Sequence, residues 1–274
     1  MATGALAQAK IIRFDLSPKY FIHVPQAPTI ERRAIFSRDE ANPWEMQGTI
    51  GILDGRPVGL SNHTWSHLDA PFHLFEDGES FDQIEPRKYL VSWAKVIDLT
   101  GTEDASKRET IEAVNYHSII TPDELPSAEE LAGYDALLIL TGFSALIDRK
   151  YPMREGADEH YPNVSREAAE LIASYQNINL VGIDSPSFDK PHTKAIAHRI
   201  LLGRRPNPIY LLETLSTTRL AQHAPKEVML TVEPLRADRL RADGALCSVY
   251  AYSADDNNSL LRELTWLMKN AEIR

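Results

Sequence analysis

Three histidines and one aspartate lie close together in the segment HTWSHLDAPFH: His63, His67, Asp69 and His73. Because side chains alternate along a strand, these four odd-numbered positions share one face of an extended segment. A helix would instead turn Asp69 away from the two histidines before it, and Pro71 disfavours helical backbone at Ala70. We therefore predict an extended or bent strand that gathers the four side chains.

Two imidazoles and one carboxylate at this spacing could hold a divalent metal ion. Four strand residues span ~13 Å and a histidine nitrogen lies ~2.0–2.1 Å from a metal, so His63 and His67 share an ion only if the chain bends between them. Asp69 lies one strand repeat from His67 and can supply the third ligand. Such a site keeps a position for water and suits Zn²⁺, and Mn²⁺ or Fe²⁺ also accept these ligand types.

His73 follows Pro71-Phe72, a rigid step that would hold it near the metal but outside the ligand set. An imidazole placed there is a candidate general base for metal-bound water, because imidazoles titrate near neutral pH. The alternative is a hydrogen-bonded structural cluster of the same four residues without a metal.

The composition of the chain limits what else it could do. With 274 residues, 43% hydrophobic and 25% charged, it is typical of a folded protein, and one domain over residues 1–274 is the economical interpretation, with residues 1–10 as a flexible terminus. Its single cysteine, Cys247, excludes an intrachain disulfide and a cysteine-rich zinc module. A net charge of −10 disfavours nucleic acid as a partner. We see no secretory signal and no apolar run of ~18 residues, so we expect a cytoplasmic protein without a membrane span.

Strands and helices alternate in the pattern of a mixed α/β domain. We expect strands at 10–15, 96–99, 137–140, 180–183, 228–232 and 246–252, and a hairpin at 49–60 that turns at Asp54-Gly55. We expect helices from Ser127 with Glu130 as its capping partner, from Ser165 to about Ser174, and over 260–269. Prolines over 24–50 indicate a loop or arm.

The histidine-rich segment resembles the signature of the cyclase family, which includes bacterial kynurenine formamidases and isatin hydrolases. That signature reads His-x-Gly-Thr-His-x-Asp-x-Pro-x-His. The proline and all four functional positions match, whereas Trp65 and Ser66 stand where the family has glycine and threonine. Three later segments agree in order: LLILTGF, VGIDSPSFD and IAHRILLG. The resemblance covers roughly residues 11–252.

The resemblance implies a swivelling β/β/α-type fold, with a mixed sheet and flanking helices, in a homo-oligomer. It also implies a second metal, held by Asp69, His198 and Glu213, so that one or two Zn or Mn ions are expected. The spacing from His198 to Glu213 is about three residues longer than in the family, with the extra residues in Arg204–Pro208. His192 is the competing candidate for His198, and we interpret it as an exposed loop residue.

The function implied by the resemblance is hydrolysis of a C–N amide bond in a small molecule, either an aryl formamide or a cyclic amide. Trp65 and Phe72 are the candidate substrate-binding walls, and His73 is the candidate base. Two alternatives stay open. One is a natural-product cyclase or dehydratase that uses the metal as a Lewis acid, and the other is a non-catalytic metal-binding relative.

Overall fold

The structure is a computed structural model that describes residues 11–17, 37–38, 46–53, 56–63, 65–101, 103–111, 113–148, 160–190, 193–235, 241–254 and 258–271. The segments 37–38, 46–53 and 56–61 are described by their backbone alone. The expected flexible terminus at 1–10, the Asp54-Gly55 turn and His192 lie outside the described residues.

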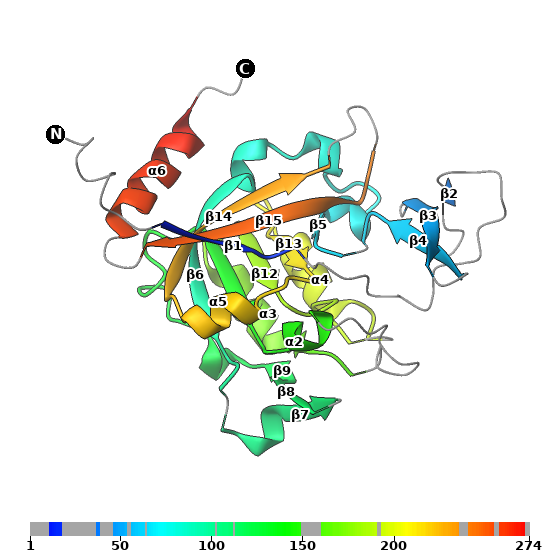
Figure 1. The fold of residues 1–274 in the computed structure, drawn as a ribbon. Helices are drawn as coiled ribbons and strands as arrows, with labels where there is room; N and C mark the ends of the chain where they lie inside the picture. The colour runs from blue at the N-terminus through cyan, green and yellow to red at the C-terminus, as the bar shows by residue number, and fades with distance from the viewer. Residues whose placement is uncertain are drawn as a thin grey trace.

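An eight-stranded sheet forms the centre of the molecule (Figure 1). Its order is β1-β15-β14-β6-β10-β12-β13-β5, and β5 also pairs with β15, so the sheet closes on itself. The strands, in that order, are Ile11–Asp15, Gly244–Ala254, Glu227–Pro234, Val91–Asp98, Ala136–Leu140, Leu180–Ile183, Tyr210–Glu213 and His67–Asp69. The run from β6 to β13 is parallel, and every other pairing is antiparallel.

The closure of the sheet depends on one long strand. Along one edge, β15 pairs with β14 over Cys247–Tyr252. Along its other edge it pairs first with β5, over Gly244–Leu246, and then with β1, over Tyr250–Ala254. The short strand β5 is therefore held between β13 and β15, with hydrogen bonds on both sides.

The parallel strands β10, β12 and β13 are buried on both faces of the sheet. In β10, Ala136, Leu138 and Leu140 belong to the core enclosed by the sheet, whereas Leu137 and Ile139 pack in the core under the helices. All five side chains are fully buried, as expected of a parallel strand covered on both faces. Each such burial contributes about 1.5–3 kcal/mol for a large aliphatic side chain.

The helices are α2 (Ser144–Ile147), α3 (Arg166–Ser174), α4 (Ile196–Leu202), α5 (Thr218–His223) and α6 (Asn258–Asn270). Side chains of α3, α4 and α6 supply the core against the outer face of the sheet. The remaining strands are β2 (Ser37–Arg38), β3 (Met46–Leu53), β4 (Arg56–Ser61), β7 (Arg108–Ile111), β8 (Val114–His117), β9 (Ile119–Ile120) and β11 (Asn163–Val164). Five 3₁₀ turns are η1 (Pro71–His73), η2 (Phe81–Gln83), η3 (Pro86–Lys88), η4 (Ala105–Lys107) and η5 (Pro122–Glu124).

The predicted mixed α/β fold with flanking helices is confirmed, including the antiparallel β3–β4 pair and the capping of α3 by the Ser165 hydroxyl. The expected helix at Ser127 is wrong. The capping box forms, since Ser127 N–H donates to Glu130 Oε2 over 2.9 Å. The chain nevertheless makes only turns there, because Gly133 enters the left-handed region at φ 88° three residues before β10 begins.

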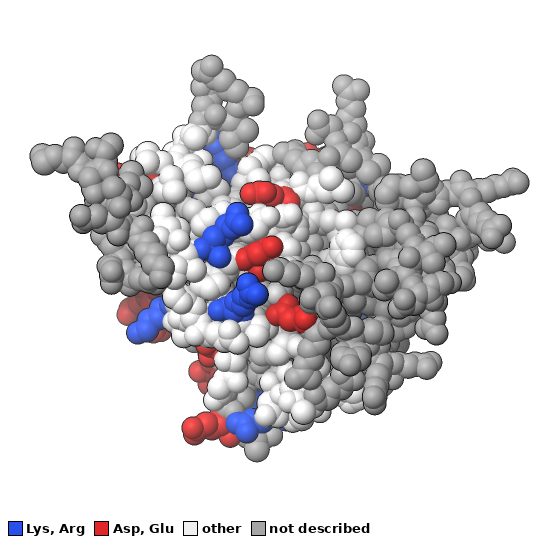
Figure 2. Space-filling view, viewed as in Figure 1, with Lys and Arg blue, Asp and Glu red and all other residues white. Residues whose placement is uncertain are grey.

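Charged side chains of both signs are mixed on the surface. On the face shown in Figure 2, the described lysines and arginines lie beside aspartates and glutamates. Among the helices that the structure describes, none is long and apolar enough to cross a bilayer.

Candidate metal centre

The register of the sheet brings the first ligands together. His67 and Asp69 lie two residues apart on β5 and so point to the same face. The antiparallel β13 places Glu213 opposite His67. On the other side, β15 begins at Gly244 opposite Asp69, so Asp243 enters the site directly before the strand.

The chain bends on both sides of β5, so of the predicted extended or bent strand only His67–Asp69 is extended. His63 lies in a turn, and Trp65 adopts a left-handed backbone with φ 58°, which provides the expected bend between His63 and His67. After Asp69 the chain enters η1, which starts at Pro71 and ends at His73. These bends place the centroid of the His63 ring 4.3 Å from that of the tilted His73 ring and 5.1 Å from that of the His67 ring, which it meets edge to face.

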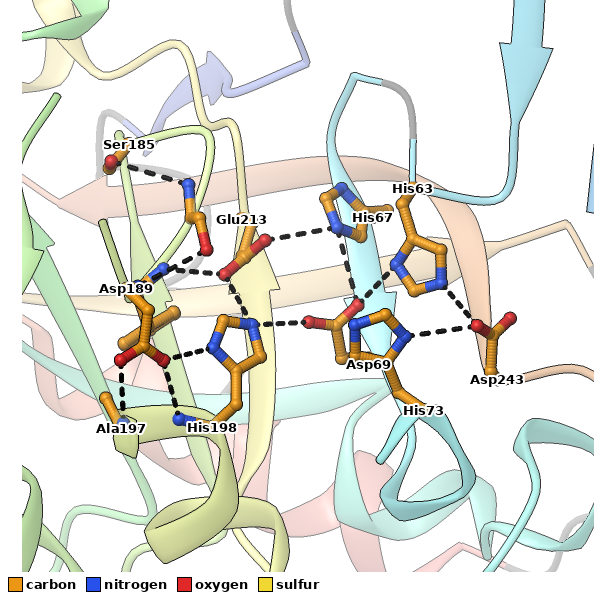
Figure 3. A network of polar contacts seen from close by, with 12 residues as sticks. His63, His67, Asp69, His73, Ser185, Asp189, Ala197, His198, Glu213 and Asp243 are labelled. Atoms are coloured by element: carbon orange, nitrogen blue, oxygen red, sulfur yellow. Dashed lines mark hydrogen bonds and ion pairs between the residues drawn. The ribbon is translucent and has the colours of Figure 1, made fainter. Parts of the chain in front are cut away.

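His198 reaches the cluster from α4 and is held from behind by Asp189. Asp189 Oδ2 accepts hydrogen bonds from His198 Nδ1, at 2.7 Å, and from the His198 backbone N–H, at 3.0 Å. Its Oδ1 accepts from the backbone N–H of Ala197 at 2.9 Å. The residue before Asp189, Phe188, donates its backbone N–H to Glu213 Oε1 at 2.8 Å. Figure 3 shows Asp189, His198 and Glu213 within one network of polar contacts.

These outer contacts fix which nitrogen of each ring carries its proton. His67 Nδ1 lies 2.8 Å from the carbonyl oxygen of Trp65, which only accepts, so this nitrogen donates. His198 Nδ1 donates to Asp189 in the same way. The Nε2 atoms of both rings are then left with lone pairs that face the carboxylates.

The carboxylates Asp69 and Glu213 lie between the imidazoles. His67 Nε2 is 3.4 Å from Asp69 Oδ1 and 3.3 Å from Glu213 Oε2. His198 Nε2 is 3.4 Å from Asp69 Oδ2 and 3.1 Å from Glu213 Oε1. His63 Nδ1 lies 2.8 Å from Asp69 Oδ1. Asp69 is 0% exposed and faces three imidazole rings.

Asp243 was not predicted from the sequence, and it lies against two of the histidines. Its Oδ2 is 2.9 Å from His63 Nε2 and 3.1 Å from His73 Nδ1. An aspartate before a strand carries no pattern that distinguishes it from a loop residue, so no local signal could have found it. Gly244 beside it allows the contact, because a Cβ there would lie 2.8 Å from His63 Cε1.

The charges of the cluster shift its pKa values in opposite directions. Burial alone would lower the pKa of His63 and His198, but the facing carboxylates, Asp243 and Asp69 for His63 and Glu213 for His198, hold both pKa values well above the usual range. Burial alone would raise the pKa of Asp69, but His67 and His63 hold it well below the usual range. The carboxylates of the cluster therefore favour a positive charge on the imidazoles that face them, or between the two.

The donor set fits a divalent metal. Lone pairs on His63, His67 and His198 face carboxylate oxygens at 2.8–3.4 Å, an arrangement that requires a proton or a metal ion between them. Two sets have ligand atoms within 4.8 Å of one another: His63, Asp69 and His73, and His67, Asp69 and Glu213. Imidazole and carboxylate ligands suit Zn²⁺ and Mn²⁺. The structure thus brings together all five predicted ligands and the candidate base His73.

A cavity of about 300 Å³ opens over the cluster. Four histidines, Asp189 and Glu213 form its floor, and the rest of the lining is Tyr161, Pro186, Ser187, Lys190, Thr193, Lys194 and Ala195. The two predicted aromatic walls are not in the described lining. Phe72 is 2% exposed and lies under the Arg241 guanidinium, 4.1 Å from its ring centroid, and Trp65 is half-buried at the bend.

The other described histidines lie apart from this cluster. His117 is buried against Glu124 at 3.0 Å, and His223 packs on Phe14 with ring centroids 5.2 Å apart. His160 is exposed. The Cys247 thiol is buried, and burial raises its pKa.

A closed mixed sheet with an imidazole–carboxylate cluster at the end of its short strand β5 defines an α/β protein with a candidate metal centre. The chain belongs to the putative cyclase family, whose profile matches residues 14–190. The predicted resemblance is therefore confirmed.

Two curated relatives are kynurenine formamidases. The one from Bacillus cereus is 28% identical over 181 residues, which are 65% of this chain and 72% of that protein. The one from Bacillus mycoides is 27% identical over 175 residues, which are 63% and 69% of the two chains.

Solved structures show the same fold. Isatin hydrolase A from Ralstonia solanacearum has a TM-score of 0.58 at 20% identity, covering 92% of this chain and 94% of that one. Isatin hydrolase A from Labrenzia aggregata has a TM-score of 0.56 at 22% identity, covering 93% and 96%.

Proposed function

We propose that this protein is a metal-dependent hydrolase of a C–N amide bond in a small molecule. The observation that carries the proposal is a buried set of imidazole lone pairs and carboxylates that opens, beside one further imidazole, into a single cavity. The kynurenine formamidases and isatin hydrolases similar to this chain are hydrolases by name.

The metal ligands divide into two groups that share Asp69. His63, His67 and Asp69 would hold one ion, and Asp69, His198 and Glu213 would hold a second. A bound Zn²⁺ or Mn²⁺ lowers the pKa of water and polarises a carbonyl oxygen. Outer partners of His67 and His198 place the proton of each neutral ring on Nδ1, so Nε2 is the nitrogen that can bind the ion.

His73 is the proposed general base. Its Nδ1 donates to Asp243 Oδ2, so Nε2 is the atom that accepts a proton from the attacking water. The same atom then returns the proton to the departing amine nitrogen, so the base is restored at the end of one turnover. Glu213 and Asp189 are already hydrogen-bonded and lie deeper, which leaves His73 as the available proton carrier.

The cavity indicates a small polar substrate. Its volume of about 300 Å³ is at the lower end for small-molecule sites. Tyr161 offers an aromatic ring, and Ser187, Thr193 and two lysines offer polar contacts. An aryl formamide or a cyclic amide of one or two rings matches this size.

The proposal is tested with a panel of aryl formamides, cyclic amides and cyclic imides, each assayed with the Zn-loaded and the Mn-loaded protein. We expect hydrolysis of at least one class, lost in His67→Ala together with the bound metal. If the protein binds metal but turns over none of the panel, the Lewis-acid cyclase or dehydratase becomes the better explanation. If it binds no metal after reconstitution, the hydrolase proposal is wrong.

A further inference from the structure

We infer that Asp243 is a positioning residue that sets the orientation and the tautomer of two histidines at once, the ligand His63 and the base His73. The inference rests on the proposed function in its account of His73. It adds a residue outside the ligand set and the histidine-rich signature, from the opposite end of the chain.

A single carboxylate oxygen makes both contacts. Asp243 Oδ2 lies 2.9 Å from His63 Nε2 and 3.1 Å from His73 Nδ1. The other oxygen, Oδ1, accepts a hydrogen bond from the side-chain amide of Asn62. An ionised carboxylate only accepts hydrogen bonds, so His73 Nδ1 donates to Asp243. His63 faces a carboxylate at each of its two nitrogens, Asp69 at Nδ1 and Asp243 at Nε2. Because Asp69 belongs to the proposed ligand set and Asp243 does not, Nε2 is the nitrogen that keeps its proton when His63 binds a metal.

The position of Asp243 is itself fixed by the fold. The residue is 0% exposed, and its carbonyl oxygen accepts the backbone N–H of Ala70 at 2.9 Å. Gly244, next in the chain, pairs with Asp69 across the sheet. A Cβ at Gly244 would lie 2.8 Å from His63 Cε1 and 2.9 Å from the Leu68 carbonyl oxygen, so backbone and ring are in close contact here.

The contacts of Asp243 determine which nitrogen of His63 can bind a metal and which nitrogen of His73 can accept a proton. With its proton on Nε2, His63 can bind a metal only through Nδ1, the atom 2.8 Å from Asp69 Oδ1. His67 and His198 show the opposite arrangement, with Nδ1 protonated and Nε2 facing the carboxylates. For His73, the same oxygen holds Nδ1 and leaves Nε2 to accept a proton. Ligand and base are thereby linked through one atom.

The tautomers give the first test, and this test does not need activity. Long-range ¹H–¹⁵N correlation spectra of the Zn-loaded protein should show His63 with its proton on Nε2 and His67, His73 and His198 with theirs on Nδ1. Assignments come from single His→Gln variants. A proton on Nδ1 of His63, or on Nε2 of His73, would overturn the inference even if Asp243→Asn failed to fold.

The variant Asp243→Asn gives the second test. The asparagine side chain has one acceptor oxygen and one NH₂ group in place of two acceptor oxygens. The NH₂ group must therefore face a donor, either Asn62 or the two histidines. In both orientations the acceptor that the two histidines share is weakened. We expect zinc affinity to fall by about 10–100-fold, the usual effect of removing an outer partner of a ligand. At saturating zinc we expect kcat to fall by about tenfold or more with KM little changed. The exposed Asp98→Asn is the matched control.

A double-mutant cycle separates the two actions of Asp243. In a His73→Ala background, Asp243→Asn should no longer lower kcat, because its effect on turnover passes through His73. It should still weaken zinc binding, because that effect passes through His63. A folded Asp243→Asn protein with wild-type zinc affinity and wild-type kcat would overturn the inference. If the wild type hydrolyses no amide, the proposed function fails, whereas the tautomers and zinc affinity still decide the role of Asp243.

Discussion

Asp189 offers a sharp test of how the candidate centre is divided between two ions. Its carboxylate accepts three hydrogen bonds, from His198 Nδ1, from the His198 backbone and from the Ala197 backbone. Within the part of the chain that the structure describes, these hydrogen bonds join Asp189 to the ligand on α4 and to none of the ligands on β5. The substitution Asp189→Asn should therefore affect the ion held by Asp69, His198 and Glu213, and leave the other ion in place.

The expected loss of metal affinity follows from the loss of one acceptor oxygen. Both oxygens of Asp189 accept hydrogen bonds, whereas asparagine has one acceptor oxygen and one NH₂ group. That NH₂ group would face either the backbone donors or His198 Nδ1, and the hydrogen bond there is lost. Loss of an outer partner weakens metal binding by about 10–100-fold, which equals about 1.4–2.7 kcal/mol. Loss of the contacts to the first turn of α4 should also cost about 0.5–2 kcal/mol of stability without metal.

The assay is a zinc titration followed by calorimetry, with elemental analysis at a fixed free zinc concentration. We expect two binding events in the wild type and, in Asp189→Asn, one unchanged event and one weakened by the amount above. Asp98→Asn, at an exposed position outside the cluster and its cavity lining, should behave as the wild type. Equal weakening of both events, or of neither, would refute the assignment of His198 to a separate ion.

Three further predictions concern the base, its support and the bare cluster. His73→Ala should retain its zinc by elemental analysis but lose about 10²–10⁴-fold in kcat, and full activity would exclude His73 as the base. A Cβ at Gly78 would lie 2.7 Å from Pro71 C, at the start of the η1 turn that ends at His73. Gly78→Ala should therefore lower kcat and reduce the free energy of unfolding, measured in urea, by about 1–3 kcal/mol. An unchanged kcat would show that this contact does not place His73. Chelated protein should lose stability as pH rises, because folding raises the pKa values of His63 and His198 above 6.5. The contribution of these two histidines to the free energy of unfolding is complete below pH 6.5 and is lost as the pH passes through the raised values. Urea unfolding of chelated protein at pH 6 and pH 9 checks this, and equal stability at the two would contradict it.

Local patterns were enough to predict the candidate ligands His63, His67 and Asp69 and most of the elements, whereas His198 and Glu213 were implied by the family resemblance. The spacing of His63, His67 and Asp69 required a bend, and the left-handed Trp65 supplies one. Ser165 caps its helix as its type and position indicated. Fully apolar runs such as Ala136–Leu140 are buried parallel strands, because a strand covered on both faces needs no polar side.

Features set by distant parts of the chain could not be predicted in this way. The closure of the sheet depends on the pairing of β5 with β15, which no local pattern encodes. Asp243 has its role only because that pairing places it against His63. The expected aromatic wall at Phe72 failed for a similar reason, since Arg241, far along the chain, covers its ring.

The position of β5 between β13 and β15 has a consequence for the order of events during synthesis. Asn62 and Asp243, which share a hydrogen bond, lie 181 residues apart in the sequence. The ribosome therefore releases the histidine-rich segment long before the strand that holds it, and contacts so distant in sequence form slowly. A nascent chain that ends before Asp243 lacks both β15, which pairs with the β5 strand of His67 and Asp69, and the Asp243 carboxylate beside His63 Nε2. We therefore expect metal uptake by the proposed centre to follow the docking of the final strand.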